Sequence, residues 1–137
     1  MILELEFNVR PTPHQSMQFT RSGRSYKPRK IVSYQKYVVE LVKPQLPEGF
    51  EIIPAGSLIY IEKLHYIYAY PKAFSKKKKQ QGKIYKETKP DLPDNLNKAF
   101  LDALEGVVYE QDQNIVSINN LQKYYGEKDA ILLTLKY

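Results

Sequence analysis

Apolar and polar side chains follow two kinds of period along this chain. Residues 2–9 alternate between apolar and mostly acidic side chains, which predicts a half-buried strand. Residues 58–70 are β-branched and aromatic on both faces, a pattern that predicts a central strand covered on both sides. Two further strands are expected at 114–125 and 130–137, on either side of a turn.

Two other stretches repeat their apolar residues at helical spacing. The first begins at Ile31 and ends near Pro44, and the second covers residues 91–106, where Gly106 is a suitable C-terminal stop. Together with the strands, these helices predict an α/β fold. We expect one small domain over residues 1–137, in which a mixed central sheet is packed by two main helices.

Charge is distributed unevenly along the chain, whose formal net charge is +6. Residues 10–30 and 71–90 are basic and lack apolar periodicity, so both are expected to be exposed loops. Residues 68–90 contain eight lysines and one glutamate, whereas residues 91–137 contain four lysines and eight acids. A protein that only binds nucleic acid has little use for acids beside a basic patch. An enzyme that cuts the phosphate backbone needs both.

The composition also excludes several classes of protein. The chain has no cysteine, which excludes disulfides, thiolate zinc sites and cysteine nucleophiles. No apolar run approaches about 18 residues, so we expect no membrane span. The N-terminus lacks the apolar core of a secretory signal, and we expect a cytoplasmic protein without an organic cofactor.

Three aspartates are the candidate metal ligands: Asp91, Asp94 and Asp112. The first two are three residues apart at the start of the second predicted helix, where both can face one side of its first turn. Asp112 follows a short apolar run that can fold it back beside them. Three adjacent carboxylates repel one another unless a cation lies between them, and oxygen-only ligands suit Mg²⁺, with Mn²⁺ as a substitute. Lys98, one helical turn after Asp94, is a candidate to hold the scissile phosphate.

The same residues also have an ordinary structural interpretation. Asp91 can be the N-cap of the helix, with Asp94 in its first turn. Asp94, Lys98 and Asp102 can form an exposed i,i+4 ladder worth about 0.3 kcal/mol per pair, and Asp112 can be a turn residue. Spacing alone leaves the metal site and the helix cap both open.

Basic side chains on the two loops are the candidate DNA contacts. Contacts of this type are independent of sequence and weaken as salt rises. On charge alone, a solvated loop that only aids solubility is an equal alternative. The candidate residues are Arg21, Arg24, Lys76, Lys77, Lys78, Lys79 and Lys89.

Residues 89–116 contain a run of short motifs: Lys89-Pro90-Asp91, Asp94-Asn95-Leu96, Lys98, Asp102-Ala103-Leu104, Gly106, and Asp112 with Ile115. This run resembles the signature of the RusA family of Holliday junction resolvases, which are phage-borne and bacterial endodeoxyribonucleases. The upstream stretch 11–16 is similar to the family's Pro- and Gln-containing loop. One departure is that the family spaces its first two acids as D-x-D, whereas Leu92 and Pro93 make the spacing D-x-x-D here.

This resemblance implies a Mg²⁺-dependent endonuclease that resolves four-way DNA junctions by paired cuts during recombination and repair, in a bacterial or phage-infected cell. It also implies that Asp91, Asp94 and Asp112 bind the metal and that Lys98 is an essential lysine. A four-way junction has approximate two-fold symmetry, which together with the resemblance predicts a homodimer. Two alternatives remain: a non-catalytic DNA-binding protein descended from such an enzyme, and a nuclease for other branched DNA.

Overall fold

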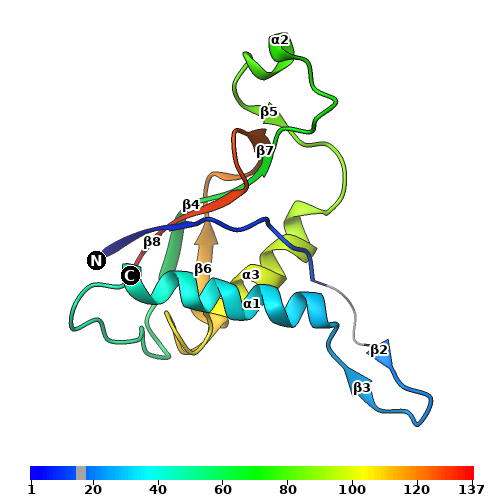
Figure 1. Ribbon diagram of the computed structural model, residues 1–137. Helices are drawn as coiled ribbons and strands as arrows, with labels where there is room; N and C mark the ends of the chain where they lie inside the picture. Colours follow the sequence, from blue (N-terminus) through cyan, green and yellow to red (C-terminus); the bar gives the residue numbers. More distant parts are fainter. Residues whose placement is uncertain (15–17) are drawn as a thin grey trace.

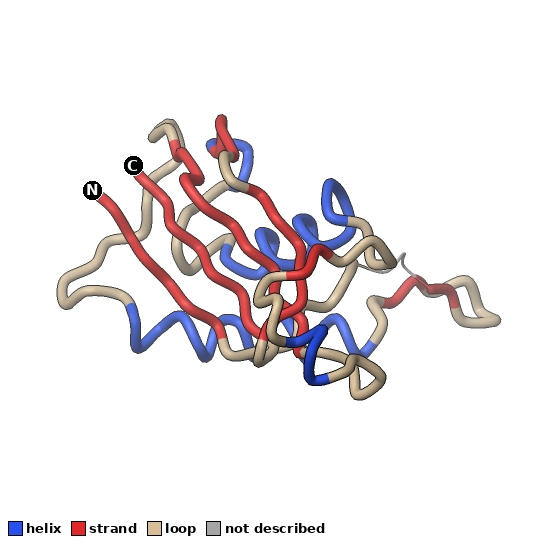
Figure 2. Tube along the Cα trace, turned by 90° about the horizontal axis from the view of Figure 1, so that it is seen from above, coloured by secondary structure: helices blue, strands red, loops and turns tan. Residues whose placement is uncertain are grey.

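The computed structural model describes residues 1–14 and 18–137 and contains a six-stranded mixed sheet. Helices α1 and α3 lie against the same face of this sheet (Figures 1 and 2). The strands of the sheet are β1 (Ile2–Phe7), β4 (Ile59–Ala69), β5 (Ile84–Tyr85), β6 (Ile115–Ile118), β7 (Leu121–Gly126) and β8 (Ala130–Lys136). The helices are α1 (Arg29–Val42), α2 (Lys76–Lys79) and α3 (Asn97–Leu104), with 3₁₀ turns η1 (Lys43–Gln45) and η3 (Asp112–Asn114) and the π-helical turn η2 (Leu92–Leu96).

Strand β4 is central, as its unbroken apolar and aromatic sequence predicts. The strand order is β1-β8-β4-β7-β5, with β6 also paired to β4. β4 pairs antiparallel with β8 on one side and parallel with β6 and then β7 on the other. The stretch 114–125, predicted to be one strand, is therefore two. The chain turns between them at Asn120, whose φ of 51° is in the left-handed region that asparagine tolerates.

The hydrophobic core lies between the sheet and the two helices. Phe100 of α3 is fully buried and makes edge-on ring contacts with Phe7 of β1 and Tyr66 of β4, at centroid distances of 5.0 and 6.0 Å. The prediction that β4 is covered on both sides is wrong for its second face. Tyr60 there is 38% exposed and Ile67 is partly exposed, because both helices pack on the opposite face.

The two basic segments project from the body at separate places (Figure 1). Residues 10–30 contain a small hairpin of β2 (Gln18–Phe19) and β3 (Ser25–Tyr26) rather than an irregular loop. Residues 71–90 contain α2, whose N-cap Ser75 accepts a hydrogen bond from the backbone N–H of Lys78 at 3.0 Å, and the short β5. Gln15 and Ser16, which belong to the resemblance in the N-terminal loop, lie outside the described residues. None of the described helices has the length and apolar character needed to cross a lipid bilayer.

Candidate metal centre and DNA-binding surface

A tight turn after α3 reverses the chain and brings Asp112 back toward the end of that helix. Gly106 has a φ of 85°, and its N–H donates to the carbonyl oxygen of Tyr109 at 2.7 Å. The buried Tyr109 hydroxyl donates to the carbonyl oxygen of Leu101 at 2.6 Å, which fastens the returning chain to α3. The sequence predicted this return from Gly106 and the apolar run that follows it.

Three carboxylates meet where the chain returns. Asp102 lies on α3, Glu105 is its C-cap residue and Asp112 begins η3, and one oxygen from each lies within 4.8 Å of the other two. The sequence predicted Asp112 as a ligand, but it placed Asp102 in a surface ladder and in the family-like motif without a metal-binding role, and it did not single out Glu105. Their i,i+3 spacing at the end of a helix, just before a glycine turn, is the signal that could have found them.

Two of the three acids, Asp102 and Glu105, have raised pKa values. Partial burial raises the pKa of Asp102, and the charge of Asp112 and a hydrogen bond with it raise it further, while Lys98 and Lys27 oppose the shift. Desolvation followed by the charges of Asp112 and Asp102 also raises the pKa of Glu105. Such repulsion is what a divalent cation relieves. Because the donors are all oxygens at a spacing that one ion can span, the group fits a hard cation such as Mg²⁺.

Asp91 is the N-cap of η2, as the structural interpretation of the sequence predicted. Its Oδ1 accepts from the backbone N–H groups of Asp94 and Asn95 at 3.2 and 2.8 Å, and its Oδ2 accepts from Asn95 Nδ2 at 3.0 Å. Asp94 is exposed in the first turn of η2. Asp91 and Asp94 therefore lie at the start of the helix and outside the group formed by Asp102, Glu105 and Asp112.

The extra residue between the first two acids is absorbed by a π-helical turn. The N–H of Leu96 donates to the carbonyl oxygen of Asp91 at 3.2 Å, which is an i→i+5 bond. A π turn contains one residue more than an α turn, so the insertion relative to D-x-D widens this turn and leaves α3 regular. Leu96 is fully buried, and Asn97 accepts a hydrogen bond from the Tyr66 hydroxyl at 2.9 Å. These contacts hold the start of the helix against β4.

The basic residues singled out in the sequence are on exposed projections. Arg21 and Arg24 lie in the turn of the β2–β3 hairpin, and the lysines of α2 are all exposed. Lys78 places its ammonium 4.0 Å from the centroid of the Phe74 ring. Lys89 is exposed two residues before Asp91, and Lys98 is exposed on α3. Exposed lysines therefore lie both before and after the start of the helix in the sequence.

Oxygen ligands that can hold a divalent cation, together with exposed basic segments that can contact phosphates, are features of enzymes that cut a nucleic-acid backbone. The family model described as "Endodeoxyribonuclease RusA" matches residues 8–136, so the chain belongs to the RusA family. This confirms the resemblance found in residues 89–116 and the fold predicted from the apolar pattern of the chain. It also supports endonuclease activity, a branched DNA substrate and a role in recombination. No curated protein matches the chain.

Proposed function

We propose that this protein is a Mg²⁺-dependent endonuclease that resolves four-way DNA junctions by paired phosphodiester cleavage. The observation that supports the proposal best is the approach of Asp102, Glu105 and Asp112 within 4.8 Å in a chain of this family. A bound divalent cation supplies electrostatic stabilisation of the charge that develops on the phosphate during attack by water. Mn²⁺ is expected to substitute for Mg²⁺ because it accepts the same oxygen ligands.

Asp112 is the central ligand of the proposed site, because both the sequence motif and the geometry point to it. The resemblance favours Asp91 and Asp94 as its partners. Asp94 is exposed, and a carboxylate that caps a helix retains lone pairs for a cation, so both remain proposed ligands. Distance favours a second set, Asp102 and Glu105, which already lie beside Asp112.

The proposed DNA surface consists of the cations around the helix start. We propose that Lys98 holds the scissile phosphate; its position on α3 between Asp94 and Asp102 supports this role, as does its charge, which lowers the pKa of Asp102. Contacts to the arms of the junction are proposed for the two projections and for Lys89. The residues are Arg21, Arg24, Lys76, Lys77, Lys78, Lys79 and Lys89.

A homodimer is part of the proposal, since two matched cuts on a two-fold symmetric junction require two active sites. The sheet face opposite the helices is the proposed interface. On this face Ile67, Tyr124 and Leu132 are partly exposed on the neighbouring strands β4, β7 and β8. Apolar side chains exposed on one sheet face can be buried when the same face of a second copy packs against them in an isologous contact.

The test of the proposed function is cleavage of a synthetic four-way junction by the purified protein. We expect symmetric cuts with Mg²⁺, none with EDTA, and slower cleavage of flaps, forks and linear duplex at the same concentration. Faster cleavage of a flap or fork would favour the broader nuclease. Tight junction binding without any cleavage in Mg²⁺ or Mn²⁺ would favour a non-catalytic DNA-binding protein.

Two substitutions at Asp91 separate helix capping from metal binding. Asparagine caps a helix as well as aspartate does, whereas alanine does not, so Asp91→Asn should leave the free energy of unfolding within about 0.5 kcal/mol and Asp91→Ala should lower it by about 1 kcal/mol. If Asp91 also binds the metal, both variants should lose cleavage to a similar extent, roughly a hundredfold or more. Urea denaturation and single-turnover cleavage measure the two effects. Full activity in Asp91→Asn would mean that Asp91 caps the helix and does not bind the metal.

A further inference from the structure

Two half-buried lysines beside the Asp91 loop form no salt bridge with any acid among the described residues. Lys86 follows β5 and Lys123 lies on β7, and the N–H of Lys86 donates to the carbonyl oxygen of Lys123 at 3.1 Å. Within the described part of the chain, neither lysine has a carboxylate oxygen within 4.0 Å. Partly buried cations are usually paired, because desolvation disfavours an isolated charge.

Both ammonium groups are bonded to Thr88, three residues before Asp91. Lys123 Nζ donates to the carbonyl oxygens of Thr88 and Pro90, each at 2.7 Å. Lys86 Nζ donates to Thr88 Oγ1 at 2.6 Å and to the Tyr125 hydroxyl at 3.3 Å. An ammonium group has three N–H donors. Each lysine therefore keeps one donor for a further acceptor near Thr88.

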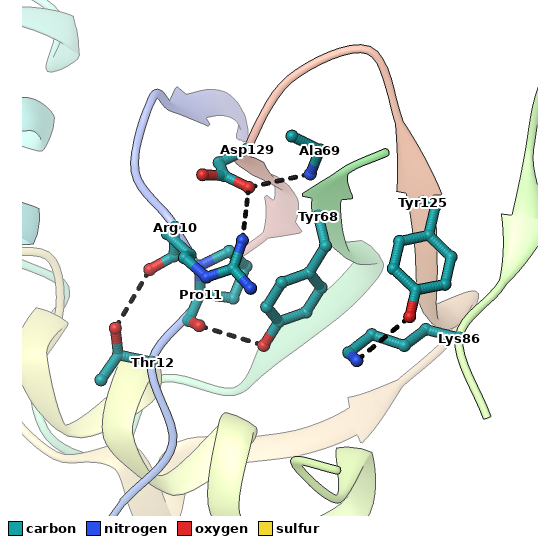
Figure 3. Close-up of polar contacts among 8 residues, drawn as sticks. All are labelled: Arg10, Pro11, Thr12, Tyr68, Ala69, Lys86, Tyr125 and Asp129. Atoms are coloured by element: carbon teal, nitrogen blue, oxygen red, sulfur yellow. Dashed lines mark hydrogen bonds and ion pairs between the residues drawn. The ribbon is translucent and has the colours of Figure 1, made fainter. Parts of the chain in front are cut away.

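The side chains around Lys86 and Lys123 make the electrostatic potential near Thr88 positive. Figure 3 shows Lys86 bonded to Tyr125 in a group that also contains Tyr68 and Arg10, and Lys86 Nζ is 5.2 Å from both tyrosine ring centroids. Burial and then the charge of Lys86 lower the pKa of Lys123, while Asp91 opposes the shift. Burial raises the pKa of Tyr125, but its bonds to Thr88 and Lys86 and the lysine charges outweigh that effect and lower it.

The lysine pair adjoins a hollow that leads to Asp91. Pro90, which accepts a hydrogen bond from Lys123, also lines this hollow, together with Pro13, His14, Lys89, Asp91 and Asn95. A DNA strand that reaches the acids past Asp91 would bring its backbone phosphates close to these cations. A phosphodiester has two non-bridging oxygens that share one negative charge, and they can accept hydrogen bonds from two ammonium groups.

We propose that Lys86 and Lys123, with the Tyr125 hydroxyl, form a binding site for one backbone phosphate of the DNA strand that enters the active site past Asp91. This inference rests on the proposed function, because it takes the ligand to be DNA. In the free protein the two amines hold residues 88–90, and in the complex their remaining donors bind the phosphate. The site is distinct from Lys98 on α3 and from the lysines of α2.

The test is the affinity for a four-way junction in EDTA, measured by fluorescence anisotropy over a range of salt concentrations. The readout does not depend on cleavage or on the metal. We expect Lys86→Met combined with Lys123→Met to weaken binding about tenfold at low salt, since charge-assisted hydrogen bonds to the phosphate are lost. The slope of log affinity against log salt should become shallower by about 0.9, which corresponds to one phosphate.

Three further proteins make the result decisive. Lys86→Met alone keeps both backbone bonds of Lys123 and should show part of the loss, and the double Arg variant should restore the wild-type salt slope. Lys128→Met is the matched control, because it removes the same charge from an ammonium already paired with Glu6 at 3.1 Å, and it should bind like the wild type. If Lys86→Met and the double Met variant match the wild type in affinity and slope, the phosphate site does not exist. If the wild type itself does not bind branched DNA, the proposed function fails with it.

Discussion

Replacing Asp112 with asparagine is expected to lower the rate of junction cleavage by roughly a thousandfold, equivalent to about 4 kcal/mol of transition-state stabilisation. Asp112 is the one acid common to the two proposed ligand sets, Asp91 with Asp94 and Asp102 with Glu105, so its loss should weaken metal binding in either case. Single-turnover cleavage at saturating enzyme measures the effect. Affinity for the junction in EDTA should persist or increase, because one carboxylate fewer repels the phosphates.

The stability of the Asp112→Asn protein is the control for this result. The charge of Asp112 raises the pKa of both Asp102 and Glu105, so in the metal-free protein the substitution relieves repulsion. The free energy of unfolding in EDTA should therefore stay equal or rise. Cleavage at the wild-type rate by a folded Asp112→Asn protein would remove Asp112 from the site.

Two further substitutions identify which acids bind the metal ion together with Asp112. Asp94→Asn and Asp102→Asn each remove one charge from an acid that is not buried in the core; Asp94 lies in η2 and Asp102 lies near the C-terminal end of α3. If Asp91 and Asp94 hold the ion, Asp94→Asn should abolish cleavage and Asp102→Asn should slow it only moderately. The reverse result would assign the ion to Asp102 and Glu105.

Removal of the four charges of α2 is expected to weaken binding to DNA strongly, and this is the second-largest effect that we predict. We expect Lys76–Lys79 replaced together by glutamine to bind a junction roughly a hundredfold more weakly at low salt, because up to four phosphate contacts are lost. The salt slope should become shallower by as much as about 3.6. Folding should be unaffected, since α2 is exposed and contributes no side chain to the core.

The matching variant with four arginines keeps the charges of α2 and should keep both the affinity and the salt slope. Anisotropy titrations in EDTA between low and physiological salt compare the three proteins. An unchanged slope in the glutamine variant would mean that α2 is a solvated projection that favours solubility alone.

The elements that could be predicted from the sequence are those whose apolar residues repeat regularly. The alternation in β1 and the helical stripe of α1 are local properties and were predicted to within a few residues of their ends. The second predicted helix, residues 91–106, corresponds to the π-helical turn η2 followed by α3. The break at Asn120 was missed because β6 and β7 read as one stretch, and only their separate pairing with β4 divides them. The exposure of the second face of β4 depends on which side of the sheet the two helices cover. A local sequence pattern cannot predict that.

The candidate site, like the fold, could be predicted from the sequence only in part. The return of the chain at Gly106 and the cap at Asp91 follow from local residue preferences, and the sequence indicated both. The proximity of Asp102 and Glu105 to Asp112 depends on the contact between Tyr109 and Leu101 that fastens the turn. Lys86 and Lys123 are 37 positions apart and meet only because β5 pairs with β7, so spacing could not associate them.

Direct binding of a divalent ion is the measurement closest to the central claim, which is that Asp112 holds the catalytic cation. Mn²⁺ titration followed by electron paramagnetic resonance, without DNA and at constant ionic strength, gives the affinity of the wild type and of Asp112→Asn. We expect saturable binding by the wild type and at least tenfold weaker binding by the variant, with Mg²⁺ competing for the same site. Equal Mn²⁺ affinity in the two proteins would contradict the assignment of the metal to Asp112.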